Sequence, residues 1–373
     1  MLVPQGEFEL ERNPRNDSLQ AWDAADELLL GHLDEIQILA RESRVLIVND
    51  SFGALAVALA DHRVYSWNDS YLAQKAMKSN LRLNGYQPDR VETNSAIGFP
   101  DYALDCVLIK IPKTLALLEH QLFELRKLLH RDSRIIAAGM SRIIHSSTLE
   151  LFETILGPTT TTRAWKKSRL IKTDRDHSMN EGQSHFPEHY QLSVDRDYSI
   201  ANHASLFSRD RLDKGSRFLI ENIPVSEKYK NIVDLGCGNG VLGLIAASFN
   251  SQASLLFSDE SYMAIASSQD NFHDAFTDQR EANFMVGDCL QTVAPNSQEL
   301  VLNNPPFHQQ HSSGDTIAWN MFKDARRVLA VGGELWVVGN RHLGYHAKLK
   351  KLFGNCETAA ANRKYVILKA IKP

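Results

Sequence analysis

A glycine-rich stretch in the second half of the chain has the residue types of a ligand-binding turn. In NIVDLGCGNGVLG, residues 231–243, an apolar run ends at Asp234, and Gly236, Gly238 and Gly240 alternate before a second apolar segment begins. Glycines at this spacing let the backbone turn tightly from a strand into a helix and leave room for a ligand against the main chain. Many such turns bind nothing, so the stretch predicts a site only together with other residues.

Two further strand ends follow in the order of a doubly wound sheet. The run LLFSD ends at Asp259, 19 residues after Gly240, where such folds place a carboxylate on a ribose hydroxyl. The run LVLNNPPF, residues 300–307, is an apolar strand that ends in Asn-Pro-Pro-Phe. A nicotinamide or flavin cofactor would also suit the glycine turn. However, the turn lacks the last glycine of G-x-G-x-x-G, and a dehydrogenase does not predict Asn-Pro-Pro-Phe.

The form DLGCGNG resembles the class I S-adenosylmethionine-dependent methyltransferases, and NPPF resembles the catalytic motif of the amino-group methyltransferases of that class. The resemblance implies that Asp234 and the turn backbone hold the amino-acid end of the cofactor, and that Asp259 accepts both ribose hydroxyls. It also implies that Asp288 meets the adenine amino group and that the Cys289 amide meets a ring nitrogen. Asp259 could instead cap a helix, and Asp288 could be a solvated loop residue. The expected cofactor-binding residues are Asp234, Gly236, Cys237, Gly238, Asn239, Gly240, Asp259, Asp288 and Cys289.

The NPPF motif, Asn304 to Phe307, suits methyl transfer to an exocyclic base amine. Such an amine is a poor nucleophile because its lone pair is delocalised into the ring, so the site must orient it. The side-chain oxygen of Asn304 and the carbonyl of Pro305 can accept its two hydrogens, and Pro305 with Pro306 fixes the backbone that places them. Phe307 can stack on the flipped base, which is worth about 1–3 kcal/mol. The alternative is a proline-rich turn without chemistry.

Residues on either side of these motifs have less specific roles. His308 and His311 form H-x-x-H without a nearby carboxylate or cysteine, so we expect no metal, and these side chains to line the base pocket or contact RNA. The stretch LFSRDRLDKGSRFL precedes the first strand, and the family uses it to cover the cofactor; a packing helix is the alternative. The candidates in that stretch are Phe207, Arg209, Asp213, Gly215 and Ser216.

Strands alternate with helices along both halves of the chain, which predicts parallel α/β sheets. The second half repeats the first, so we expect an internal duplication with two Rossmann-like class I methyltransferase domains. The first copy is expected to be degenerate. It has Ser51, Phe52 and Gly53 in a shortened turn, which Phe52 would fill, and it has residues 111–114 in place of NPPF. The expected early elements are a helix at 19–30, strands at 44–50, 63–69 and 106–111, and helices between them.

The predicted domains are residues 1–174, a degenerate domain for RNA recognition, and residues 191–373, the catalytic domain. Residues 175–190 are polar and lack apolar periodicity, which indicates a linker. Residues 191–200 alternate like a β-hairpin. Basic residues close both copies, beside Trp165 in the first, and suit a single-stranded RNA track, although solvated edge strands are an alternative. They are Arg163, Lys166, Lys167, Arg169 and Lys172, then Lys348, Lys350, Lys351, Arg363 and Lys364.

The composition agrees with a globular protein of two domains. The chain has 373 residues, and its net charge of −4 excludes a protein that coats nucleic acid non-specifically, so RNA must be bound by local patches. No stretch approaches a membrane-spanning length without charges, and no signal peptide is evident. The cysteines are scattered, which argues against structural zinc and disulfides and for a cytoplasmic location. They are Cys106, Cys237, Cys289 and Cys356.

Taken together, the whole chain resembles the bacterial large-subunit (23S) ribosomal RNA guanine-N2 methyltransferases, the methyltransferase G family. LFSRDRLD, NNPPFHQQH, LGPTTTT and AWKK carry this resemblance. It implies transfer of a methyl group from S-adenosylmethionine to the N2 amine of a specific guanine by a monomer without metal or membrane. The small-subunit (16S) guanine-N2 methyltransferase has the same duplicated architecture and is one alternative. A non-catalytic RNA-binding or assembly factor is the other.

Overall fold

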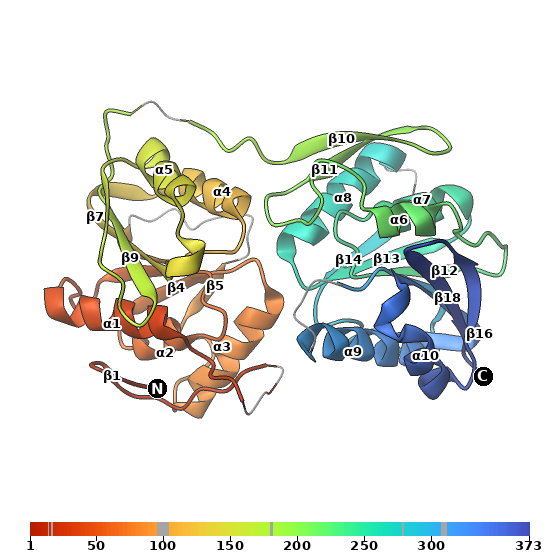
Figure 1. Cartoon of the computed structure of the whole chain (residues 1–373), viewed down its shortest axis with the longest axis horizontal. Coiled ribbons are helices and arrows are strands. Elements are labelled where there is room, and N and C mark those ends of the chain that lie inside the picture. The colour runs from red at the N-terminus through yellow and green to blue at the C-terminus, as the bar shows by residue number, and fades with distance from the viewer. Residues whose placement is uncertain (14, 16–17, 95–103, 180–181, 278–279, 307–311) are drawn as a thin grey trace. The chain divides into compact units, whose positions relative to one another are not determined.

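The computed structural model describes the whole chain except residues 14, 16–17, 95–103, 180–181, 278–279 and 307–311. The chain forms two compact units, Met1–Phe186 and Pro187–Pro373 (Figure 1). The boundary lies inside the segment 175–190 that we expected as a linker. Part of that segment packs on the first unit, where the Arg126 guanidinium donates to the carbonyl of Met179.

The first unit is built on a twisted sheet with helices on both faces. Among its described residues, seven strands form one sheet in the order β5-β4-β3-β6-β7-β9-β8, parallel from β5 to β7 and antiparallel at β9 and β8. The strands of this sheet are β3 (Arg44–Val48), β4 (Arg63–Trp67), β5 (Glu92–Asn94), β6 (Leu104–Lys110), β7 (Leu129–Met140), β8 (Thr159–Thr161) and β9 (Ser168–Thr173). The helices are α1 (Ala24–Ile36), α2 (Ala54–Ala58), α3 (Tyr71–Leu83), α4 (Leu115–Arg126) and α5 (Ser146–Ile155), and a small hairpin pairs β1 (Leu2–Val3) with β2 (Gly6–Glu7).

The second unit repeats this plan strand for strand. Over its described residues the sheet order is β14-β13-β12-β15-β16-β18-β17. Its strands are β12 (Asn231–Leu235), β13 (Ser254–Asp259), β14 (Ala282–Val286), β15 (Gln298–Asn303), β16 (Leu329–Asn340), β17 (Glu357–Ala361) and β18 (Tyr365–Ile371). Its helices are α6 (Lys214–Ile220), α7 (Val241–Phe249), α8 (Tyr262–Phe276), α9 (Ser312–Val328) and α10 (Tyr345–Phe353). The expected hairpin is present as β10 (Glu188–Ser193) and β11 (Asp197–Asn202).

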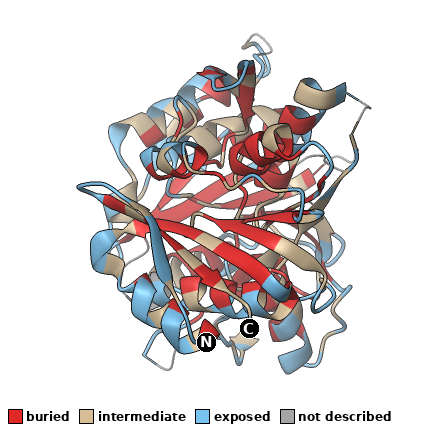
Figure 2. Ribbon diagram, turned by 90° about the vertical axis from the view of Figure 1, so that its right-hand side faces the viewer, coloured by how far each residue is buried: buried red, intermediate tan, exposed pale blue. Residues whose placement is uncertain are grey.

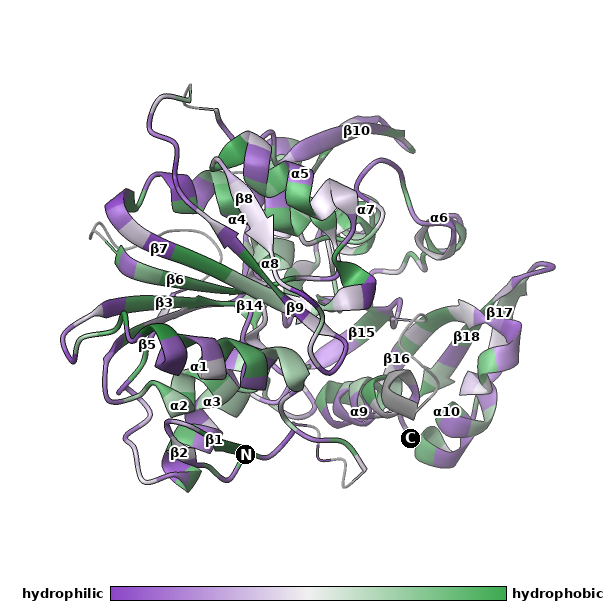
Figure 3. Cartoon of the chain, turned by 60° about the vertical axis from the view of Figure 1, so that its left-hand side comes forward, coloured by the Kyte–Doolittle hydropathy of each residue, from purple (hydrophilic) through white to green (hydrophobic). Residues whose placement is uncertain are grey.

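Each sheet has a hydrophobic layer on both faces, as its parallel strands require. In β3, Val45 and Ile47 pack with α1 to α3, whereas Leu46 and Val48 pack with α4 and α5. The second unit divides its helices in the same way, with α6 to α8 on one face and α9 and α10 on the other. In Figure 2 central strands are coloured as buried, and in Figure 3 the central strands β3 and β6 of the first unit are largely coloured as hydrophobic.

The duplication extends to individual hydrogen bonds. In the first unit the side-chain amide of Asn80 on α3 donates to the carbonyl of Phe52, at 2.8 Å. In the second, the amide of Asn271 on α8 donates to the carbonyl of Asn239, at 2.9 Å. Both asparagines therefore fasten the strand-to-helix turn to the next helix. The predicted internal duplication is confirmed.

The first-unit turn differs from its prediction because it is not shortened. Residues 49–53 and 236–240 connect strand and helix over the same length. Both turns begin and end with a residue of left-handed backbone, at φ 64° and 83° in the first unit and 70° and 77° in the second. The prediction included Asn49 and Asp50 in the strand, whereas the strand ends at Val48 and Asn49 takes the left-handed position that opens the turn. Asparagine tolerates this conformation through local polar contacts.

The chemistry of the first-unit turn is nevertheless lost. The carboxylate of Asp50, rather than the ring of Phe52, occupies the start of the helix, where it accepts four backbone N–H groups at 3.0 Å. Phe52 instead lies under the Arg12 guanidinium, 4.6 Å from its ring centroid. Asn68 takes the place that Asp259 has in the second unit. Both residues lie at the end of corresponding strands, β4 and β13, and the side-chain oxygen of each accepts the N–H of the serine that caps the next helix.

The first-unit counterpart of NPPF begins one residue earlier than predicted. Val48 pairs with Ile109, and the equivalent Leu235 pairs with Asn303. The register therefore aligns Lys110, not residue 111, with Asn304. The sequence alignment matches Pro112 with Pro305, whereas the hydrogen-bonded register of the strands matches Lys110 with Asn304.

Lys110 holds the first helix against the end of β6. Its ammonium donates to Asp23 at 2.7 Å and to Asp26 at 2.6 Å, the N-cap and third residue of α1. Burial raises the pKa of Asp26 to about 6, although the charge of Lys110 opposes this. The capping box of Asp23 and Asp26 also sets the start of α1 at residue 24, whereas we had expected the helix over 19–30.

We predict that Lys110→Met destabilises the first unit strongly. The change leaves the buried carboxylate of Asp26 without its counter-ion, which typically costs about 3–5 kcal/mol in free energy of unfolding. Chemical denaturation followed by tryptophan fluorescence measures this loss. Lys127→Met is the matched control, because the exposed pair of Lys127 with Glu124 contributes less than about 1 kcal/mol. Equal losses in the two variants would contradict the prediction.

Candidate active site

The glycine turn of the second unit needs its glycines for different reasons. Gly236, Gly238 and Gly240 all have positive φ, at 70°, 55° and 77°. A Cβ on Gly236 would lie 2.7 Å from the Met321 side chain, and one on Gly240 would lie 2.6 Å from Ser268. A Cβ on Gly238 would meet no described atom within 4 Å. The middle of the turn therefore presents bare backbone on an open side, which is what a ligand lying against the main chain requires.

Asp234 lies under this turn and is completely buried. One carboxylate oxygen accepts the backbone N–H of Gly243 on α7, at 2.8 Å. The other oxygen is buried and has no hydrogen-bond partner among the described residues. Burial raises the pKa of Asp234 to about 8, and the charge of Asp259 adds to the shift. The carboxyl group thus braces the start of α7 and keeps one acceptor unused.

Asn239 and Cys237 serve the shape of the turn. The Asn239 amide donates to the side-chain oxygen of Asn202 at 2.9 Å and to the Tyr190 hydroxyl at 3.2 Å, which fastens the turn to the β10–β11 hairpin. Cys237 is buried, which raises the pKa of its thiol well above the usual range, and its backbone N–H donates to the carbonyl of Ser258. The resemblance implies that these two residues meet the cofactor through their backbone, and the Asn239 side chain contacts protein groups instead.

Asp259 contacts the glycine turn directly. One carboxylate oxygen accepts the backbone N–H of Gly238 at 3.0 Å, and the other accepts that of Ser261 at 3.0 Å. The N-cap of α8 is Ser261, whose hydroxyl accepts the N–H of Ala264. Capping is therefore not the task of Asp259, and its carboxylate lies where the end of β13 meets the turn.

Asp288 and Cys289 follow the next strand, β14, at the same edge. The carbonyl of Asp259 accepts the N–H of Gly287 at 2.9 Å, and the Ser258 hydroxyl donates to the carbonyl of Cys289 at 2.8 Å. Asp288 also accepts a hydrogen bond from Gln291 at 2.9 Å. These contacts fix the loop of Asp288 and Cys289 beside Asp259.

Asn304 is oriented by the first turn of α6. Its amide nitrogen donates to the Ser216 hydroxyl at 2.9 Å and to the Asp213 carboxylate at 3.2 Å. Its side-chain oxygen is shielded from solvent and has no partner among the described residues. Pro305 is buried and Pro306 is exposed. An unpaired buried acceptor costs about 1–3 kcal/mol, so it indicates a group held ready for a ligand.

The contact between α6 and Asn304 was missed by the sequence interpretation. Asp213 and Ser216 were expected only to cover the cofactor, and they lie about ninety residues from Asn304 in the chain. The first unit has the same arrangement, because Asp23 and Asp26 hold Lys110 from the same two helix positions. Only that internal comparison could have revealed the contact.

Some predicted residues cannot be placed. Phe307, His308 and His311 lie outside the described residues. Within the part of the chain that the structure describes, no three His, Cys, Asp or Glu side chains come together as metal ligands, and no helix is long and apolar enough to span a membrane. The expected cofactor-binding residues and the described part of NPPF lie at or just after the carboxyl ends of β12 to β15, so one edge of the sheet gathers them.

Two family models match the chain. The model described as RLMG N-terminal domain matches residues 1–177, and the methyltransferase small domain matches residues 197–369. A curated relative from Yersinia enterocolitica, named ribosomal RNA large subunit methyltransferase G, is 50% identical over 100% of this chain and 94% of its own length.

A solved structure supports the fold. It is a T. thermophilus 16S ribosomal RNA N2 methyltransferase in complex with AdoMet and guanosine. It is similar to this chain with a TM-score of 0.77 over 94% of this chain and 92% of its own, at 20% sequence identity. At that identity the likeness shows a shared two-unit architecture.

We predict a pH-dependent effect of Asp234→Asn in the absence of ligands. The pKa of Asp234 is about 8 in the folded protein, above its unfolded value. Its contribution to stability is therefore complete below pH 4 and is lost as pH rises through 8. The wild type should lose ~1.4 kcal/mol per pH unit relative to the variant until about pH 8, and then stay level. Thermal denaturation from pH 6 to pH 9 measures this difference.

The control is Asp274→Asn, a substitution on the exposed surface of α8 that removes the same charge. A constant difference between wild type and Asp234→Asn across this pH range would contradict the buried protonated carboxyl.

Proposed function

The chain belongs to the ribosomal RNA large subunit methyltransferase G family, and we propose that it methylates the exocyclic N2 amine of a specific guanine in 23S ribosomal RNA. It is an S-adenosylmethionine-dependent methyltransferase whose catalytic half is the second unit. The observation that carries the proposal is Asn304, whose amide nitrogen is fixed and whose oxygen is buried without a partner among the residues that the structure describes.

The carboxyl edge of the second sheet fits S-adenosylmethionine. Gly238 leaves open backbone, and Asp234 has one buried oxygen that can accept from the ammonium of the cofactor's amino-acid end once the carboxyl has lost its proton. Asp259 offers a carboxylate for the ribose hydroxyls, and the loop of Asp288 and Cys289 lies beside it for the adenine. When bound, the cofactor supplies a methyl group on a sulfonium centre, which is open to attack by an amine.

The hydrogen bonds of Asn304 determine which of its atoms meets the substrate. An ionised carboxylate only accepts hydrogen bonds, so Asp213 must face the NH₂ group of Asn304. The oxygen then points away from α6, where it can accept a hydrogen of the guanine amine. The Pro305 carbonyl can accept the other hydrogen, and the lone pair is then directed at the methyl group. We assign Asp213 and Ser216 as positioning residues for Asn304, and Phe307 to stacking on the base.

The choice of RNA rests on sequence. The relative with the large-subunit name is 50% identical along the whole chain, whereas the 16S enzyme is 20% identical, which supports the large-subunit assignment. A non-catalytic assembly factor has no use for an unpaired acceptor at Asn304. We further propose that the enzyme acts as a monomer in the cytoplasm.

We predict that Asn304→Ala abolishes methylation while it leaves the affinity for S-adenosylmethionine within about twofold. The loss in kcat should be about 10²-fold or more, as for other preorganised polar groups. The experiment is mass-spectrometric mapping of 23S ribosomal RNA from cells that lack the gene and carry the wild-type or the variant copy. Calorimetry on the purified variant measures cofactor affinity.

Asp259→Ala is the comparison, since it should weaken cofactor binding. If Asn304→Ala loses cofactor affinity to the same degree, the assignment of Asn304 to the substrate is wrong. If no 23S nucleotide differs between cells with and without the gene, the RNA assignment is wrong.

We propose that the first unit supplies RNA affinity without chemistry. Its turn is occupied by Asp50, and its counterpart of Asn304 is the ion-paired Lys110. It retains a turn between β8 and β9 with exposed basic residues and Trp165, which suits a nucleic acid backbone. Flipping a guanine costs a few kcal/mol, and contacts elsewhere on the RNA must offset this cost.

We predict that a fragment of residues 187–373 folds and binds S-adenosylmethionine but binds ribosomal RNA at least about tenfold more weakly. Its affinity should also depend less on salt, because fewer phosphates are neutralised. The measurement is RNA affinity against salt concentration for the full chain and the fragment. Equal affinities and slopes would leave the first unit as a remnant of the duplication.

A further inference from the structure

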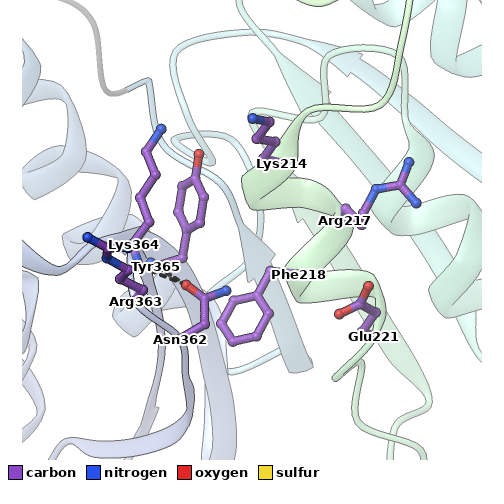
Figure 4. A pocket seen from close by; sticks show the side chains of 8 residues that line it. All are labelled: Lys214, Arg217, Phe218, Glu221, Asn362, Arg363, Lys364 and Tyr365. Carbon is purple, nitrogen blue, oxygen red and sulfur yellow. Dashed lines mark hydrogen bonds between the residues drawn. The ribbon is translucent and has the colours of Figure 1, made fainter.

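A basic pocket lies beside the positioning helix α6 in the second unit. It has a volume of about 410 Å³ and is formed by α6 on one side and the turn between β17 and β18 on the other (Figure 4). Its lining residues are Lys214, Arg217, Phe218, Glu221, Asn362, Arg363, Lys364 and Tyr365. None of these residues has a role in holding the cofactor or orienting Asn304.

Four of the lining side chains are cations, and Glu221 is the one acid among them. Lys214, Arg217, Arg363 and Lys364 are exposed, and none forms an ion pair with a described carboxylate. Cations gathered in this way repel one another, so the pocket favours an anion that neutralises them. The rings of Phe218 and Tyr365 line the same pocket, which gives it an apolar part for a sugar or base.

The first unit has an ion pair at the positions that correspond to two of these cations. Counted from the caps of α1 and α6, Glu27 is the counterpart of Arg217. Because Ser168 pairs with Met140 as Tyr365 pairs with Asn340, Lys166 is the counterpart of Arg363. Glu27 and Lys166 form an ion pair at 2.9 Å.

The second unit has therefore replaced a salt bridge between helix and turn by two arginines. The second unit therefore lacks this ion pair and has two guanidinium groups, of Arg217 and Arg363, in one pocket. Arginine presents a fork of N–H donors that matches the oxygens of a phosphate. A change of this kind is unfavourable without a ligand and favourable with an anionic one.

We propose that this pocket binds a phosphodiester of the RNA substrate, next to the nucleotide that is methylated. Arg217 and Arg363 hold the phosphate, Lys214 and Lys364 add charge, and Phe218 and Tyr365 contact the attached nucleoside. The proposal rests on the proposed function, since it identifies how the same enzyme grips its RNA.

The location agrees with this role. Asp213 and Ser216 of α6 hold Asn304, and Lys214 and Arg217 are the next residues around the same helix. A helix with its side chains is about 10–12 Å across, so the pocket lies within reach of the nucleotides that flank the target. The cofactor is excluded as occupant because its sulfonium is cationic and these side chains would repel it.

The test is Arg217→Glu in the full chain, which restores the acid that the first unit carries at this position. The glutamate can pair with Arg363, so the fold has an internal precedent and the pocket loses its anion site. We expect the KM for 23S ribosomal RNA to rise about tenfold or more. The slope of log affinity against log salt should become shallower by about 0.7–0.9 for each phosphate that the variant leaves without a cation. The affinity for S-adenosylmethionine should stay unchanged.

The matched control is Lys230→Glu, which reverses an exposed charge just before β12, at the opposite edge of the sheet. Arg363→Ala, in an exposed turn, provides a second pocket variant that does not depend on a new ion pair. If both pocket variants bind and methylate RNA like Lys230→Glu, the pocket is not an RNA site and the proposed function stands. If the wild type itself methylates no ribosomal RNA, the proposed function fails instead. Weaker binding with the same salt slope would also overturn the phosphate assignment.

Discussion

Both units depend on one contact. The first residues of a helix bind the side chain that follows a central strand. In the second unit the cap and third residues of α6 hold the amide of Asn304, and in the first unit those of α1 hold Lys110. In each case the helix that comes before the first strand of the sheet in sequence is joined to the end of a central strand, β6 or β15. The contact sets where the helix lies and what the strand end can present to a ligand.

The contact has opposite consequences for hydrogen bonding in the two units. Lys110 is saturated by two carboxylates, and the adjoining turn is saturated by Asp50, so the first unit has no acceptor left at this place among its described residues. The second unit leaves one oxygen of Asn304 and one of Asp234 buried and unpaired within the described part of the chain. Unpaired buried oxygens cost stability, and such groups persist where a ligand completes them. The two copies of the duplication therefore differ in what they leave available to a ligand at this place.

A similar difference between the two units is found at the surface. Glu27 and Lys166 form an ion pair between helix and turn in the first unit, and the arginines at the corresponding positions of the second unit line a pocket. Asp213, the N-cap of α6, and Ser216 contact Asn304, whereas Lys214 and Arg217 of the same helix line the basic pocket. Residues three apart on a helix share a face, whereas adjacent residues do not. Asp213 and Ser216 therefore lie on one face of α6, and Lys214 and Arg217 lie on another.

The sequence by itself determined the α/β class, the duplication, the order of strands and helices, and the residues at the strand ends. Hydrophobic periodicity and glycine spacing are local signals, and the ends of parallel strands necessarily meet at one edge of the sheet. It did not determine the length of the first turn, because an asparagine takes a glycine's conformation at residue 49. It also misaligned Lys110 by one residue, since register depends on hydrogen bonds between strands distant in the chain. Only the tertiary structure decided that Asp213 and Ser216 orient Asn304, and that Arg217 and Arg363 share a pocket. Those contacts join residues far apart in sequence, and a local pattern depends only on neighbouring residues, so it does not predict them.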